Sequence, residues 1–174
     1  MHEVVQRLKR DGIPVDDDGL SIEALEVALV EHRPALVYTI PAYQNPTGVT
    51  LSHERRARLV ELAQVHEFLI AADEVYQLLS FDGGWVAPMA AWIDSGVVLS
   101  LGTFSKILAP GLRLGWIQAA PPLLEKLCDA PVVVSGAGLN PFTSAIVRVL
   151  LEEGLLSPHV EYLRGTLADR AATM

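Results

Sequence analysis

Four short runs of apolar residues stand out along the chain, and segments with helical periodicity also occur along it. The runs are ALVYTI at 35–40, FLIAA at 68–72, GVVLSL at 96–101 and LGWIQA at 114–119. Continuous apolar runs of this length are typical of strands that are buried on both faces of a sheet. We therefore predict four buried strands.

A helical pattern fills the interval between the first two runs. Ser52 is a candidate N-cap for a helix that reaches His66, because apolar residues recur on one helical face after it. Further helices are predicted at 21–31, 123–128 and 141–153, and the polar residues 15–19 (VDDDG) predict a turn. Alternation of strands and helices predicts an α/β fold, a three-layer α/β/α arrangement around a mostly parallel sheet.

Composition and charge narrow the class of protein. Apolar residues make up 51% of the chain and charged residues 20%, which is typical of a globular domain. The net charge is 13 − 21 = −8, which argues against a broad nucleic-acid-binding surface. The basic residues Arg55, Arg56 and Arg58 fall within a predicted helix, where we expect them to form a solvated face.

The single cysteine and the absence of long apolar runs indicate the cellular compartment in which the protein is expected. Cys128 alone permits neither an internal disulfide nor a multi-cysteine metal site, and a reducing compartment follows by default. No run approaches the ~20 apolar residues that span a bilayer. Residues 1–12 are charged and lack an apolar signal core. We expect a cytoplasmic protein with no membrane partner and no nucleic-acid partner.

Polar residues follow three of the predicted strands. Asn45 comes after the first strand, Asp73 closes the second and Lys106 comes after the third. In parallel sheets, ligands bind beyond the carboxyl ends of the strands. We therefore expect these side chains, together with the Tyr76 hydroxyl, to converge on one pocket sized for a pyridine ring.

Lys106 and Asp73 offer the clearest chemistry. A lysine beyond a buried strand can be desolvated and can then condense with an aldehyde, whereas a lysine in an ordinary loop is simply solvated. A carboxylate at the end of an apolar strand requires a partner. A protonated pyridine nitrogen would be such a partner, and the alternatives for Asp73 are a helix cap or a salt bridge.

Five other polar positions could assist. Asn45 begins NPTG, which predicts a turn, and its amide could also donate to an anionic ring oxygen. Tyr76 could donate to the same oxygen or be an ordinary, partly buried tyrosine. Arg113 could bind a phosphate, with hydroxyl donors from Thr103 and Ser105, or it could form a salt bridge at the start of a strand.

The order of these motifs resembles a known family. NPTG at 45–48, DEVY at 73–76, FSK at 104–106 and PGLRLG at 110–115 are similar to the class I/II aminotransferases of fold type I. The segment 102–116 most resembles the branch that contains 2-aminoadipate aminotransferases and MocR-like proteins. The resemblance extends from about Val15 to the end of the chain.

The resemblance implies pyridoxal 5′-phosphate as the cofactor and a role for each motif residue. It implies that Lys106 holds the cofactor, that Asp73 pairs with the ring nitrogen, and that Asn45 and Tyr76 donate to the ring oxygen. It implies catalytic roles for Lys106, Asp73 and Tyr76. The implied phosphate contacts are Thr103, Ser105 and Arg113.

The implied reaction is amino-group transfer between an amino acid and a 2-oxo acid, in a protein that is a homodimer when full-length. The family's members are much longer, so we expect a fragment with little activity alone. Residues 1–150 would form part of the cofactor-binding large domain, and 151–174 the start of a truncated small domain. The alternatives are a ligand-sensing domain of a MocR-type regulator, a lyase that uses the same cofactor, and an inactive remnant. Which amino acid is used does not follow from the sequence.

Overall fold

The computed structural model describes residues 12–81, 87–136 and 140–173. The prediction about a signal core falls on residues 1–12, of which 1–11 lie outside the described part, as does Met174 at the end of the chain.

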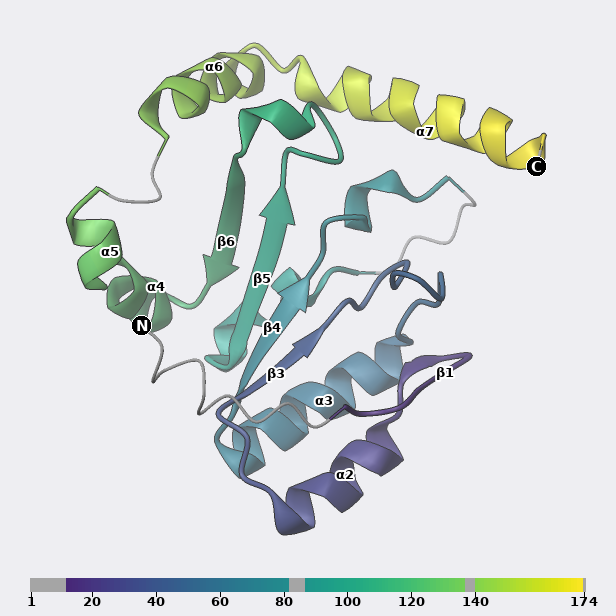
Figure 1. Cartoon of the computed structure of the whole chain (residues 1–174), viewed down its shortest axis with the longest axis vertical. Coiled ribbons are helices and arrows are strands. Elements are labelled where there is room, and N and C mark those ends of the chain that lie inside the picture. The colour runs from purple at the N-terminus through teal and green to yellow at the C-terminus, as the bar shows by residue number, and fades with distance from the viewer. Residues whose placement is uncertain (1–11, 82–86, 137–139, 174) are drawn as a thin grey trace.

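A four-stranded sheet forms the centre of the molecule, in the order β3-β4-β5-β6 (Figure 1). The strands are β3 (Leu36–Thr39), β4 (Leu69–Asp73), β5 (Val98–Thr103) and β6 (Gly115–Ala119). The first three run parallel, and β6 pairs with β5 in the antiparallel direction. The predicted α/β class and mostly parallel sheet are confirmed, and each strand lies within two residues of its predicted bounds.

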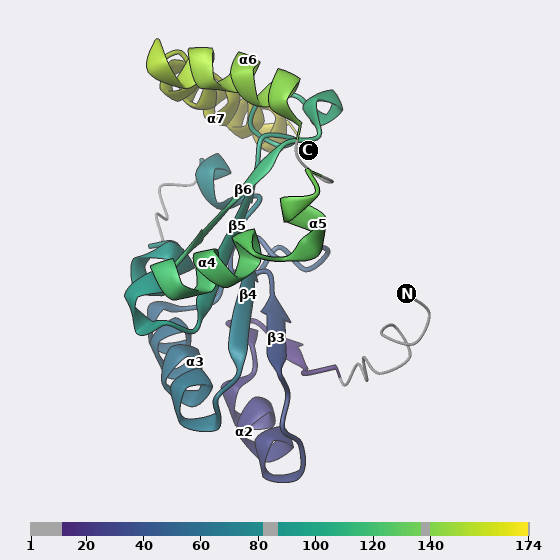
Figure 2. The ribbon, with the colours of Figure 1, turned by 90° about the vertical axis from the view of Figure 1, so that its left-hand side faces the viewer.

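Two helices cover one face of this sheet. They are α2 (Ile22–Glu31) and α3 (His53–His66). Each begins at a serine whose hydroxyl accepts a backbone N–H, Ser21 from Ala24 and Ser52 from Arg55, so the predicted Ser52 cap is confirmed. Their apolar sides pack on the sheet in one buried cluster, which includes Leu25, Leu29, Leu59, Val60, Phe68 and Ile70. Figure 2 shows α3 on one side of the sheet.

The opposite face of β3 is open in the described part of the chain. Val37 and Thr39 are buried towards the helices, whereas Leu36 and Tyr38 are 48% and 56% exposed. Ile117 of β6 is also exposed. The prediction of burial on both faces is therefore wrong for β3 and β6, which are the outer strands of this sheet. It holds for the central strand β4, whose three middle residues are buried.

The predicted polar turn near the start of the chain is confirmed as a small hairpin. It joins β1 (Val15–Asp16) to β2 (Gly19–Leu20), with Asp16 opposite Gly19. Arg55 of α3 holds this hairpin through two hydrogen bonds to the Asp16 carboxylate, at 2.6 and 2.9 Å. The Arg55 side chain holds the pKa of Asp16 below its usual value.

The expected solvated face of α3 needs a correction at Arg56. Arg55 and Arg58 reach surface carboxylates, but Arg56 is fully buried. Its guanidinium donates to the backbone carbonyls of Leu51, Ala87 and Pro41, at 2.8, 2.9 and 2.6 Å. The cause is helical periodicity, because Arg56 shares the buried face of α3 with Val60 and Ala63.

Helices follow the sheet in the second half of the chain. They are α4 (Pro121–Cys128), α5 (Pro131–Val134), α6 (Pro141–Glu152) and α7 (Leu156–Ala172). Short 3-10 helices are η1 (Gln77–Leu79), η2 (Met89–Ser95) and η3 (Pro110–Leu112). Figure 1 shows α6 and α7 beyond the carboxyl end of β5.

A second apolar cluster fixes α6 and α7 to the sheet. Val147 of α6 and Val160 of α7 are buried with Phe104 and Ile107, which belong to the turn after β5. Arg164 of α7 also donates to the Leu78 carbonyl of η1 at 2.8 Å. These helices therefore pack directly against the turn that carries Lys106.

Across the described residues, we find no helix with the length and apolar character that crossing a membrane requires.

Candidate active site

Three predicted site residues lie beyond neighbouring parallel strands. Asn45 follows β3, Asp73 is the last residue of β4, and Lys106 lies three residues after the end of β5. Because β3, β4 and β5 are parallel, their carboxyl ends meet at one edge of the sheet. The placement of these residues at one edge agrees with the sequence prediction.

Asp73 forms a hydrogen bond that the sequence did not suggest. The Tyr38 hydroxyl on β3 donates to Oδ2 of Asp73 at 2.5 Å. Within the described part of the chain, Oδ1 of Asp73 receives no hydrogen bond and the carboxylate forms no ion pair. The partner is thus a phenol, neither the helix cap nor the salt bridge left open as alternatives.

The Asp73 carboxylate changes the acidity of Tyr38. Partial burial, the hydrogen bond to Asp73 and the nearby negative charge together raise the pKa of Tyr38 to about 12. Each cause penalises the phenolate, either by removing water or by placing a second anion beside it. Tyr38 therefore remains a hydrogen-bond donor at neutral pH.

Lys106 lies on a turn whose other side chains anchor it. Phe104 and Ile107 are buried, and the amides of Leu108 and Ala109 both donate to the Phe104 carbonyl. The indole of Trp116 packs against Phe104, with ring centroids 4.8 Å apart. Lys106 itself is exposed, so the described residues do not provide the desolvation that the sequence suggested.

Two of the predicted site residues approach each other directly. The Nζ atom of Lys106 lies 5.8 Å from the centroid of the Tyr76 ring. This distance is within the range of a cation–π contact. Tyr76 is half-buried at the start of η1, three residues after Asp73, so it brings the lysine close to the end of β4.

Thr103 and Ser105 shape the backbone ahead of Lys106. The Thr103 hydroxyl donates to the Leu114 carbonyl at 3.3 Å and accepts the Ser105 N–H at 3.1 Å. Phe104 N–H also donates to the Leu114 carbonyl. This pattern ties the turn after β5 to the segment that enters β6.

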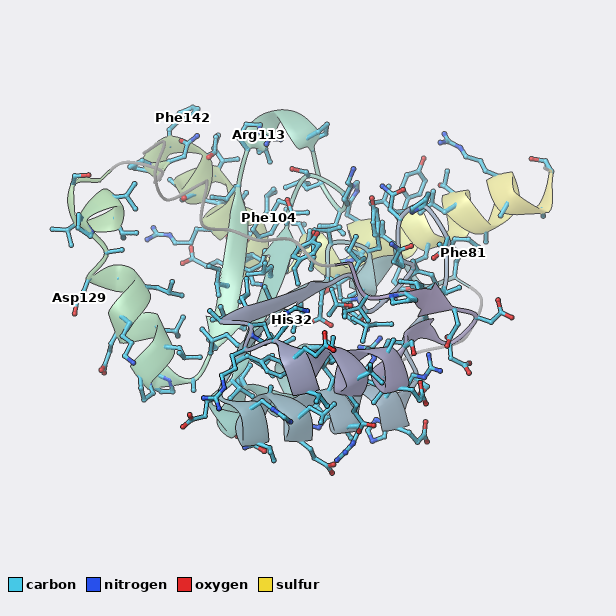
Figure 3. All side chains as sticks on the ribbon, turned by 60° about the horizontal axis from the view of Figure 1, so that its bottom comes forward. His32, Phe81, Phe104, Arg113, Asp129 and Phe142 are labelled. Atoms are coloured by element: carbon cyan, nitrogen blue, oxygen red, sulfur yellow. The ribbon has the colours of Figure 1, made fainter. Side chains whose placement is uncertain are left out.

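Arg113 lies on that entering segment, which Figure 3 shows as the turn ahead of β6. Its backbone has the left-handed conformation, with φ of 51°, and its side chain is exposed. The guanidinium reaches only the Pro110 carbonyl, at 3.5 Å. The salt bridge considered for Arg113 is not found in the described ranges, and its guanidinium is accessible to an anion.

Asn45 occupies the predicted turn. Gln44 N–H donates to the Val49 carbonyl at 2.8 Å, and Gly48 has the positive φ of 76° that this turn requires. Asn45 is exposed, and no hydrogen bond connects it to the other predicted site residues in the described part. The turn is confirmed, and the ring-oxygen contact stays a prediction.

A buried polar network supports the end of β4. Glu74, the residue after Asp73, accepts hydrogen bonds from the Met89 N–H at 2.7 Å and from the Ser100 hydroxyl at 2.6 Å. The Arg56 guanidinium lies 3.8 Å from Glu74 and binds the Pro41 and Leu51 carbonyls on either side of the Asn45 turn. Arg56 thus connects the segments that carry Asn45 and Asp73.

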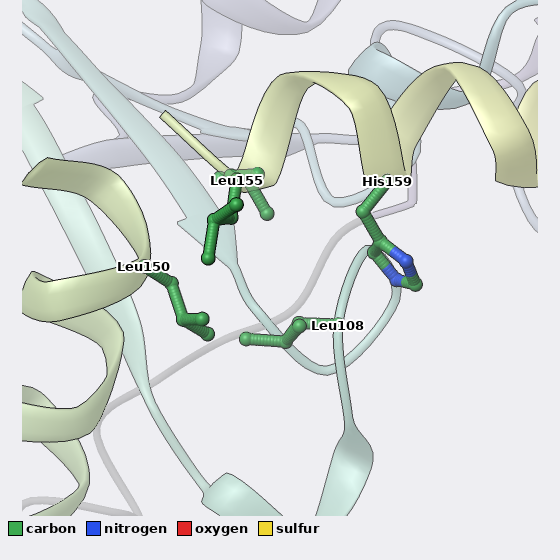
Figure 4. A pocket seen from close by; sticks show the side chains of 5 residues that line it. Leu108, Leu150, Leu155 and His159 are labelled. Carbon is green, nitrogen blue, oxygen red and sulfur yellow. The ribbon is translucent and has the colours of Figure 1, made fainter. Parts of the chain in front are cut away.

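A separate pocket of about 230 Å³ lies between α6, α7 and the turn after β5. Leucines line most of it, together with His159 (Figure 4). The residues that line it are Leu108, Leu150, Leu155, Leu156 and His159. None of them is a predicted site residue, so a ring-sized pocket around Asp73 and Lys106 stays a prediction.

Comparison with known proteins identifies related sequences and structures. The family model for aminotransferases of class I and II matches residues 5–173. An aromatic-amino-acid aminotransferase of Thermococcus litoralis is 44% identical over 153 residues, which is 85% of this chain and 36% of that protein. An uncharacterized helix-turn-helix transcriptional regulator of Bacillus subtilis is 32% identical, over 91% of this chain and 33% of that protein.

A solved structure has the same fold. The α-aminoadipate aminotransferase of Thermus thermophilus, in complex with N-(5′-phosphopyridoxyl)-L-leucine, superposes with a TM-score of 0.76 at 33% identity. The match covers 87% of this chain and 39% of that one. The chain therefore spans between a third and two-fifths of the length of these relatives.

Proposed function

Because the chain belongs to the family of class I and II aminotransferases, we propose that it forms the cofactor-binding part of a pyridoxal-phosphate-dependent enzyme. The proposed reaction transfers the amino group of an amino acid to a 2-oxo acid. The observation that carries the proposal is the position of two residues. Asp73 ends β4 and Lys106 follows the neighbouring parallel strand β5, at one edge of the sheet.

The residues present fit this cofactor. The Asp73 carboxylate has an oxygen, Oδ1, without a hydrogen bond in the described part of the chain, and a protonated pyridine nitrogen is a suitable donor for it. When bound, pyridoxal phosphate supplies an aldehyde and an electron-withdrawing ring. An amine beside the ring of Tyr76 and an accessible guanidinium complete a donor set suited to an aldehyde and a phosphate.

Each residue has a distinct role in the proposed site. Lys106 Nζ would hold the cofactor through its aldehyde carbon and would carry the proton removed from the substrate Cα. Asp73 keeps the ring nitrogen protonated. Asn45 and Tyr76 donate to the ring oxygen. The proposed phosphate contacts are Thr103, Ser105 and Arg113.

We extend the proposal to the organisation of the whole protein. Residues 1–150 would belong to the cofactor-binding domain, and residues 151–174 would begin the following domain. The complete protein would be a homodimer that takes an amino acid and a 2-oxo acid as substrates.

A binding titration tests the proposal. Pyridoxal phosphate added to the chain should change the cofactor's absorbance until one equivalent is bound. Lys106→Ala should abolish this change, whereas Lys126→Ala, which alters an exposed lysine of α4, should leave it intact. Equal responses from both variants would contradict the proposal.

The similarity to a helix-turn-helix regulator supports a second candidate, the ligand-sensing domain of a MocR-type transcription factor. Such a domain would bind the same cofactor through the same residues. The complete coding sequence would distinguish the two candidate functions. A DNA-binding region encoded in frame ahead of Met1 would favour the regulator.

A further inference from the structure

Tyr38 reaches Asp73 across two neighbouring strands. In the parallel register, Tyr38 of β3 lies opposite Ala71 of β4, and Asp73 is two residues further along β4. Side chains two residues apart on a strand share one face, so Tyr38 and Asp73 are diagonal neighbours. A tyrosine is long enough to span this separation, and its hydroxyl lies 2.5 Å from Oδ2 of Asp73.

This face of β3 is the open one. Val37 and Thr39 point to the α2 and α3 layer and are buried, whereas Tyr38 is 56% exposed. The core therefore does not account for a tyrosine here, because an exposed aromatic ring gains little from packing. The described contact of its hydroxyl is with a residue of the proposed cofactor site.

The hydrogen bond gives the two oxygens of the Asp73 carboxylate different roles. Oδ2 accepts from a phenol that stays protonated at neutral pH, since the pKa of Tyr38 is raised to about 12. Oδ1 receives no hydrogen bond in the described part of the chain. A donor on one oxygen restricts rotation of the carboxylate and leaves the other oxygen for a second donor.

We propose that Tyr38 is a positioning residue that fixes the Asp73 carboxylate through Oδ2, so that Oδ1 is presented to the ring nitrogen of the cofactor. This inference rests on the proposed function, because it takes Asp73 as the partner of that nitrogen. Tyr38 itself does not touch the reacting atoms. It acts only through Asp73, so its effect depends on a ring nitrogen being present in the ligand.

The test measures the binding of two probes to the 174-residue chain. The probes are pyridoxal phosphate and its 1-deaza analogue, in which carbon replaces the ring nitrogen. Tyr38→Phe should raise the dissociation constant for pyridoxal phosphate about three- to tenfold, the usual effect of losing one hydrogen bond. Its affinity for the deaza analogue should stay within about twofold of the wild type, because that ring gives Asp73 nothing to pair with.

Two controls separate positioning from a general effect on the fold. Tyr162→Phe removes the same hydroxyl from an exposed tyrosine on α7 and should change neither dissociation constant. In an Asp73→Asn background, Tyr38→Phe should have less than about a twofold effect, because the two residues act as one unit. Circular dichroism and thermal unfolding should show that Tyr38→Phe folds as the wild type does.

The outcomes are distinguishable. If the wild type binds pyridoxal phosphate at Lys106 and Tyr38→Phe binds it equally well, or weakens both probes equally, the positioning role is overturned and the proposed function stands. If the wild type shows no binding at Lys106, the proposed function is overturned, and the role of Tyr38 with it. If Tyr38→Phe loses affinity for pyridoxal phosphate alone, the result supports both the positioning role and the proposed function.

Discussion

Arg56 and Glu74 lie buried together, with the Nη1 atom of Arg56 3.8 Å from the Oε1 atom of Glu74. The guanidinium forms its hydrogen bonds with three backbone carbonyls, and the carboxylate accepts from Met89 and Ser100. Burial lowers the pKa of Arg56, and the charge of Glu74 opposes that effect. Arg56 belongs to α3 and binds carbonyls beside the Asn45 turn, and Glu74 directly follows Asp73. The pair therefore supports the edge of the sheet where the proposed cofactor site lies.

Replacing Arg56 should destabilise the fold strongly. Arg56→Leu leaves three backbone carbonyls without these donors and leaves the buried Glu74 without its counter-charge. Loss of one partner of a buried ion pair typically costs about 3–5 kcal/mol. Urea unfolding of the two proteins measures this difference in the free energy of unfolding.

Arg58→Leu is the matched control, because it makes the same change two residues away on α3. Arg58 pairs with Glu26 and Glu61 at the surface, where ion pairs contribute about 0–1 kcal/mol. Equal losses of stability for Arg56→Leu and Arg58→Leu would contradict the supporting role of Arg56.

The titration of Tyr38 should depend on Asp73. The folded-state pKa of about 12 lies above the ordinary value of about 10, so folding favours the protonated phenol. The stability contributed by this group is complete below pH ~10 and is lost as the pH rises through ~12. In Asp73→Asn, the midpoint should fall towards 10 without reaching it, because burial, the largest cause, remains. NMR of ring-labelled tyrosine follows the midpoint, and an unchanged value in Asp73→Asn would contradict the interaction.

Two glycines should respond oppositely to the same substitution. A methyl group on Gly102 would overlap the indole ring of Trp116, which is held against Phe104. Gly102→Ala should therefore cost about 1–3 kcal/mol, as overpacking does. Gly165, inside α7, has nothing within 4 Å of the added methyl, so Gly165→Ala should stabilise the chain by about 0.5–1 kcal/mol. Thermal unfolding compares the two variants, and a shift in the same direction for both would contradict this account of the β5–β6 contact.

The positions of the four strands and a mostly parallel sheet could be predicted from the sequence because each strand is a distinct apolar run, but the antiparallel direction of β6 was not predicted. The burial of the strands could not be predicted, since an apolar run such as ALVYTI does not tell which strand is an outer one. The run at 35–40 is read correctly only when its alternation is traced, with Val37 and Thr39 inward and Leu36 and Tyr38 outward. The spacing of Arg56 to Val60 and Ala63 indicates that it lies on the buried face of α3. Its charge, however, favoured the prediction that it is exposed to solvent.

The candidate site, like the fold, could be predicted from the sequence only in part. The positions of Asp73 and Lys106 follow from strand ends, which the sequence marks clearly. Tyr38 could not be predicted, because its bond to Asp73 depends on the pairing of two strands whose contacting residues are 35 positions apart. The exposure of Lys106 likewise depends on which neighbours fold over it, and no local pattern encodes that.

The location of the bound cofactor is the most direct test of the central claim. The chain contains three lysines, Lys9, Lys106 and Lys126, so reduction of the pyridoxal phosphate adduct with borohydride, digestion and mass spectrometry can assign the label to one of them. We predict that at one equivalent of cofactor the label is found on Lys106. Lys126 is also exposed and serves as an internal control for unspecific reaction. A label shared between Lys106 and Lys126, or found mainly on Lys9 or Lys126, would contradict the assignment of this edge of the sheet as the cofactor site.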